Sequence, residues 1–167
     1  MNKQVSLLKR GIAFIIDLYL GALIATLPIS LLSYITIQEM TQNVFLLEKT
    51  VAIIAISLSL VLFIFYYLLV PLKLLQGQTL GKRLMDIKIS YSHDQELIKR
   101  QMFYLLILTS FTTLIGELLS ILTGFNVLEI VNDFTMSLSL VSVIMICFFK
   151  DHRGLYDRLA KTSLKNS

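Results

Sequence analysis

Residues 50–72 form an uninterrupted stretch without a charged side chain. A helix of about 20 apolar residues is long enough to cross the roughly 30 Å hydrocarbon core of a bilayer. Three further apolar stretches of similar length cover residues 11–37, 101–124 and 127–149. We therefore predict an all-α membrane protein, a bundle of four transmembrane helices in which residues 1–167 form a single membrane domain.

The composition agrees with lipid as the solvent around these stretches. Hydrophobic residues make up 56% of the chain, charged residues make up 16%, and the mean hydropathy is +0.76. The net charge of +4 is not concentrated in a basic stripe with interleaved aromatics, which argues against nucleic acid and favours anionic lipid headgroups as the partner. The single cysteine, Cys147, lies in an apolar stretch, so we expect a buried, inert thiol.

Two of the four stretches allow another interpretation. The first follows Lys9 and Arg10 and could be mistaken for a signal peptide, but it is too long and no small-residue cleavage pattern follows it. The fourth contains Glu129 and Asp133, so this span could begin later than residue 127. Its exact start stays open at this point.

Lysine and arginine are distributed unequally between the two sides of the predicted bundle. Lys49 lies on one side, and the other cations lie on the opposite side, at Lys3, Lys9, Arg10, Lys73, Lys82, Arg83, Lys88, Lys99, Arg100, Lys150, Arg153, Arg158, Lys161 and Lys165. Cytoplasmic segments retain positive charge. We therefore expect both termini, the loop 73–100 and the tail 150–167 to be cytoplasmic, which requires an even number of spans.

Short interfacial segments are predicted in the loop and in the tail. Leu80 and Leu84 are spaced as on one face of a short helix lying at the membrane surface. The next residues, around 87–90, alternate as in a strand. In the tail, Leu155 and Leu159 indicate a second short interfacial helix. The candidate contacts to lipid headgroups in these segments are Lys82, Arg83 and Arg153.

Asp17 is the most informative single residue, because it lies inside the first apolar stretch. An ionised carboxylate within the hydrocarbon costs about 2.5–3.5 kcal/mol on insertion scales, so it needs a partner or a proton. Arg10 is seven residues earlier, on the same helical face, and Arg100 is an equally suitable cation at the start of the third stretch. A salt bridge that fixes helix packing and a proton or cation site are both open.

Other chemistry has little support in the sequence. Residues 77–83 resemble a phosphate-binding loop but are one residue short, and Arg83 replaces the required Ser or Thr. His93 and His152 lack the neighbours of a metal site, so we expect solvated side chains and no metal or other cofactor. No nucleophile has a base beside it, and we expect a protein that is not an enzyme.

Three pieces of the chain together resemble the RDD family of bacterial membrane proteins. The first is Arg10 followed by Asp17, the second is GQTLGKRLMDIKI at residues 77–89 with Arg100 after it, and the third is RGLYD at residues 153–157. Tyr156 stands where the family often has histidine. The resemblance covers nearly the whole chain, implies a bacterial cell membrane location, and marks Asp157 as the second conserved aspartate of the family name.

The resemblance implies a polar cluster of Arg10, Asp17, Arg100 and Asp157 on the cytoplasmic side. Some members of the family are proposed to exchange sodium or other cations for protons. One hypothesis is therefore a transport-related protein in which Asp17 exchanges a proton or a monovalent cation, with a homodimer supplying the rest of the pathway. The alternatives are an assembly factor that binds a membrane partner, and a protein that handles lipid substrates through Lys82, Arg83 and Arg100.

Overall fold

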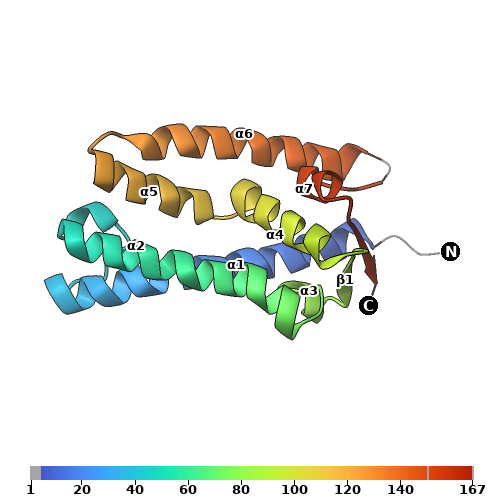
Figure 1. Cartoon of the computed structure of the whole chain (residues 1–167), viewed down its shortest axis with the longest axis horizontal. Coiled ribbons are helices and arrows are strands. Elements are labelled where there is room, and N and C mark those ends of the chain that lie inside the picture. Colours follow the sequence, from blue (N-terminus) through green and yellow to red (C-terminus); the bar gives the residue numbers. More distant parts are fainter. Residues whose placement is uncertain (1–4, 150, 167) are drawn as a thin grey trace.

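A computed structural model describes residues 5–149 and 151–166 (Figure 1). The chain is predominantly helical, and its elements follow in the order α1 (Leu7–Ile37), η1 (Val44–Leu46), α2 (Lys49–Ile64), η2 (Phe65–Leu74), α3 (Leu80–Leu84), β1 (Ile87–Ser90), α4 (Asp94–Leu108), α5 (Phe111–Thr123), α6 (Val127–Phe148), α7 (Leu155–Leu159) and β2 (Ser163–Asn166). In Figure 1 the long helices run side by side, and α3, α7 and the strands gather at one end.

The long helices coincide with the four apolar stretches. In the described part of the chain, three helices are long and apolar enough to cross a membrane: α1, α2 with its continuation η2, and α6. The third stretch, predicted as one span over 101–124, is a fourth candidate when its two helices are taken together. It is a pair, α4 and α5, bent by 62°. Residues 94–100, expected in the loop, already belong to α4, and η2 extends past residue 72 to Leu74.

Helices α1 and α2 pack closely because small and hydroxyl side chains line their contact. Ser59 donates a hydrogen bond of 2.7 Å to the carbonyl oxygen of Ala25 across the two helices. A Cβ atom at Gly21 would lie 2.3 Å from the Tyr67 hydroxyl, so only glycine allows this approach. Small residues of this kind are typical of helix interfaces in membranes, where close backbone approach replaces the hydrophobic driving force.

Helix α6 shows which medium surrounds the bundle. Ser142 is its buried residue, whereas Phe134, Met136 and Phe148 are more than 60% exposed. A soluble protein rarely exposes contiguous apolar surface of this size. The exposed face of α6 therefore suits lipid tails, in agreement with the predicted membrane span.

One end of the bundle holds a two-stranded sheet, so the expectation of an all-α fold is wrong in this detail. β1 pairs antiparallel with β2, with Ile87 opposite Asn166 and Ser90 opposite Ser163. Ile87 and Ile89 are buried and alternate with half-buried neighbours, which is the alternation seen in the sequence. The short helices predicted around residues 80–84 and 155–159 are both present as α3 and α7.

Candidate functional site

The Asp17 carboxylate is fully buried and has four donors around it. Its Oδ1 accepts hydrogen bonds from the Tyr66 hydroxyl at 3.0 Å and from the backbone N–H of Gly81 at 2.9 Å. Its Oδ2 accepts from the Thr79 hydroxyl and, at 2.9 Å, from the Lys82 ammonium. The charge in the first helix is thus paired and hydrogen-bonded, as a buried carboxylate must be.

The partner of Asp17 is Lys82, which corrects two expectations. Arg10 and Arg100 were the cations expected to meet Asp17, and Lys82 was expected to contact lipid headgroups. Lys82 is only 5% exposed, and its Nζ lies between Asp17 Oδ2 and Thr79 Oγ1, 3.0 Å from the latter. Thr79 and Lys82 are three residues apart where α3 begins, so their side chains lie on one face of the turn.

Burial lowers the pKa of the Lys82 ammonium below its usual value. Transfer from water disfavours the charged form, and the neighbouring charge of Arg100 acts in the same direction. The Asp17 carboxylate opposes both effects but does not reverse them. Lys82 is therefore easier to deprotonate than an exposed lysine.

Two adjacent tyrosines approach Asp17 from η2. The Tyr66 hydroxyl donates to the carboxylate, and the Tyr67 hydroxyl donates to the Asp17 backbone carbonyl at 2.7 Å. Neighbouring residues of a regular α-helix point about 100° apart. η2 has π-helical geometry, a rare form that is frequent at functional sites, and both ring hydroxyls reach the same residue of α1.

A second buried ion pair joins α4 to α7. Arg100 Nε donates to Asp157 Oδ1 at 2.6 Å, and both side chains are at most 2% exposed. The Thr162 hydroxyl donates to the same carboxylate oxygen at 3.4 Å, and the Arg100 guanidinium lies 5.1 Å from the centre of the Tyr156 ring. The tail is thereby fixed against the bundle by a charge pair and a cation–π contact.

Arg10 joins neither pair. Its Nη1 donates to the carbonyl oxygen of His152, in the segment between α6 and α7. The His152 ring Nδ1 lies 2.8 Å from the carbonyl oxygen of Ile146, so this histidine is not simply solvated as expected. The predicted cluster of four residues is therefore two separate ion pairs, with Arg10 contacting the tail backbone.

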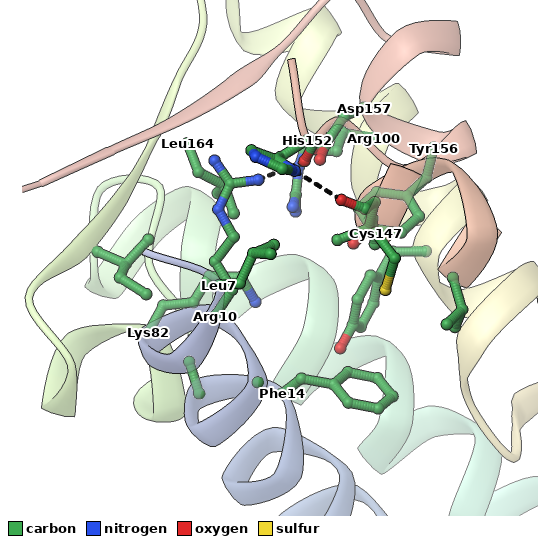
Figure 2. Close-up of a pocket in the computed structure, with 16 residues that line it drawn as sticks. Leu7, Arg10, Phe14, Lys82, Arg100, Cys147, His152, Tyr156, Asp157 and Leu164 are labelled. Carbon is green, nitrogen blue, oxygen red and sulfur yellow. Dashed lines mark hydrogen bonds and ion pairs between the residues drawn. The ribbon is translucent and has the colours of Figure 1, made fainter. Parts of the chain in front are cut away.

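A pocket of about 250 Å³ lies where these groups meet (Figure 2). Arg10, Arg100, Asp157 and His152 line one end of it, and Phe14 lies at the other. Lys82 also lines the pocket, whereas Asp17 does not. The pocket brings together residues of α1, α3, α4, α6 and α7, elements that are spread over most of the chain.

The remaining candidates lie apart from this site. Arg83 is exposed and Arg153 is half-buried, so a headgroup contact stays a prediction for both. Cys147 was expected to be buried but is exposed and lines the pocket. Within residues 5–149 and 151–166, no group of three His, Cys, Asp or Glu side chains is placed to hold a metal ion.

Fold and site together define a helical membrane protein of several spans with two buried ion pairs at one end of its bundle. The RDD family model matches residues 5–161, and the chain belongs to the RDD family. This confirms the resemblance found in the sequence. Searches of curated proteins and of solved structures returned no match.

Sequence reasoning found Asp17, Arg100 and Asp157 but missed what surrounds them. Tyr66, Thr79 and the Gly81 N–H were not expected at the Asp17 carboxylate. Thr79 and Lys82 could have been predicted from their spacing. Side chains three residues apart in a short helical turn lie on one face and can contact the same group. The position of Tyr66 could not have been predicted, because it lies in an apolar stretch and the composition does not reveal the π-helical form of η2.

Proposed function

We propose that this protein is transport-related and exchanges a proton for a monovalent cation at the Asp17–Lys82 pair. The observation that carries the proposal is a buried carboxylate whose counter-charge is a lysine. A lysine can give up its proton when buried, whereas an arginine cannot. The pair can therefore exist in two states, one with the ammonium and one with the free amine.

The charge balance favours a one-for-one exchange. When the Lys82 ammonium releases a proton, the Asp17 carboxylate is left without a counter-charge, which is costly in a buried site. A monovalent cation at the carboxylate restores neutrality, with Thr79 and Tyr66 supplying further oxygen atoms beside it. The reverse step protonates the amine and displaces the cation, so the net charge of the site is the same in both states.

Access to the pair is available at one end of the bundle. The pocket of about 250 Å³ reaches Lys82 and so connects the exchanging group with the end that carries α3 and α7. A bundle of four spans has few helices with which to form a second access route. We propose that a second copy of the chain completes the pathway.

A specific observation favours a second candidate, a static clamp in an assembly factor. All four donors around Asp17 are directed at its two carboxylate oxygens, which leaves the carboxylate fully satisfied. Such a site holds α3 against α1 whether or not an ion is moved. In this case the protein acts through a membrane partner, and Asp17 has no transport role.

Ion flux in liposomes separates the two candidates. Purified protein is reconstituted, a Na⁺ or K⁺ gradient is imposed, and internal pH is followed with a dye. We expect exchange by the native protein and a loss of at least about tenfold in Asp17→Asn and in Lys82→Arg, because arginine retains the charge but not the proton exchange. The native rate should rise as pH increases through the lowered pKa of Lys82, since only the free amine allows a cation to bind.

The matched control is Lys99→Arg, the same substitution at an exposed position of α4. It should exchange ions at the native rate. Thermal unfolding in detergent must show that Lys82→Arg remains folded. Background flux in the native protein for Na⁺, K⁺ and Li⁺ would reject the exchange function, and native flux in folded Lys82→Arg would reject Lys82 as the proton carrier.

A further inference from the structure

The pocket beside the ion pairs has an unusual combination of walls. Its charged residues are Arg10, Lys82, Arg100 and Asp157. Its apolar wall comes mainly from α1 and α6 and includes Leu7, Ala13, Phe14, Val143 and Ile146. Cations at one end and an apolar wall alongside them match an amphiphilic anion better than a fully polar ion.

Two buried guanidinium nitrogens in the pocket lining have no hydrogen-bond partner in the part of the chain that the structure describes. Arg10 Nε and Arg100 Nη2 are both buried, and neither has a hydrogen-bond partner among the described residues. The Arg100 side chain is fully buried. A buried donor without an acceptor is unfavourable, and more so when it is charged. An acceptor supplied by a ligand removes this cost.

The charges around the pocket leave a positive excess. Lys82 is neutralised by Asp17 and Arg100 by Asp157, whereas Arg10 donates to a neutral carbonyl oxygen of His152. Arg10 and Arg100 both line the pocket, and their like charges repel each other. Figure 2 shows both side chains at the same end of the pocket as His152 and Asp157. An anion placed there relieves this repulsion.

We propose that this pocket binds a phosphate-type oxyanion carried by an anionic lipid, with the headgroup at Arg10 and Arg100 and an acyl chain along the apolar wall. Guanidinium groups present paired N–H donors that match phosphate oxygens. The lipid source follows from the wall, since Leu7, Val143 and Cys147 are exposed on the lipid-facing surface of α1 and α6. The proposal is independent of ion exchange at Asp17, because it needs neither proton release nor a cation.

The test uses the full chain in a neutral detergent. Thermal unfolding, followed by circular dichroism, is measured against increasing short-chain phosphatidylglycerol, phosphatidylcholine of the same chain length, or inorganic phosphate. A ligand of the folded state raises the unfolding temperature with its concentration, which gives an apparent Kd. We expect phosphatidylglycerol to bind at least about tenfold more tightly than phosphatidylcholine, equivalent to about 1.4 kcal/mol.

Two variants locate the site. Arg10→Gln should remove the preference for phosphatidylglycerol, whereas Lys9→Gln, the neighbouring cation that does not line the pocket, should retain it. Gly11 also lines the pocket, and a Cβ there meets no atom within 4 Å. Gly11→Leu therefore adds bulk at the pocket lining and should weaken phosphatidylglycerol binding by a similar factor.

Each other outcome overturns a stated part of the proposal. Equal binding of the two lipids by the native protein, or an unchanged preference in Arg10→Gln, rejects the oxyanion site. If inorganic phosphate raises the unfolding temperature as much as phosphatidylglycerol does, and Gly11→Leu does not weaken binding, the lipid is rejected as the source of the oxyanion. If Lys9→Gln also loses the preference for phosphatidylglycerol, the preference is a general effect of charge, and the site is rejected.

Discussion

At the scale of single residues, the main problem of this chain is a carboxylate inside a membrane span. Asp17 is accommodated by one cation, two hydroxyls and one backbone N–H, all from η2 and the loop containing α3. Each donor replaces hydration that lipid cannot provide. The same contacts that make the charge tolerable also position the loop.

Removing the lysine should therefore destabilise the protein strongly. Lys82→Met leaves the buried Asp17 carboxylate without its counter-charge, and breaking a buried pair in this way costs about 3–5 kcal/mol. The free energy of unfolding, measured by denaturant titration in detergent, should fall by this amount. Lys99→Met, at an exposed position of α4, serves as control and should leave stability unchanged. Equal stability of the two variants would contradict a paired, charged Asp17.

At the scale of elements, the position of α3 depends on a close approach to α1. A Cβ atom at Gly81 would lie 2.3 Å from the Ala13 carbonyl oxygen and 2.9 Å from the Asp17 carboxyl carbon. Glycine is needed here for space, not for an unusual backbone angle. Any larger residue separates the two elements and with them the Gly81 N–H from the carboxylate.

Gly81→Ala should reduce stability by about 1–3 kcal/mol, the usual cost of overpacking a tight contact. The matched substitution is Gly11→Ala, in α1, where a Cβ meets no atom within 4 Å. That variant should be as stable as the native protein or slightly more so, because alanine is the better helix former. If both variants unfold at the same denaturant concentration, α3 does not pack against α1 as described.

At the scale of the whole molecule, the first and last described residues both pack at the same end of the helix bundle. Val5 packs with Ile87 of β1, and β2 pairs with β1 along its length. The Arg100–Asp157 pair holds α7 against α4. The tail is thus tied to the bundle by a buried charge and a sheet. The cytoplasmic location of this end stays a prediction of the charge pattern.

Breaking the second ion pair should loosen the tail before the bundle. Asp157→Asn removes the charge that balances the buried Arg100 guanidinium, so amide hydrogen exchange should accelerate in residues 155–166 and in β1, which pairs with β2. Exchange in α1 and α2 should change much less. Asp151→Asn, which weakens a solvent-exposed pair with Arg158, should change the pattern much less than Asp157→Asn does. Uniform acceleration across all helices would show that the tail is not a separate unit.

The membrane class, the approximate positions of the long helices and the need of Asp17 for a partner were predictable from the sequence. They follow from local properties: the length of an apolar stretch, the period of apolar residues, and the cost of an isolated charge in lipid. The family motifs added the order of the charged residues but not their pairing.

Only the tertiary structure decided which charges meet. Lys82 pairs with Asp17 from 65 positions away, and Arg100 pairs with Asp157 from 57 positions away. Several cations were equally suitable by type, so the choice depended on helix packing and on the space left by Gly81. Such long-range geometry is a property of the packed chain and cannot be read from the spacing of residues along it.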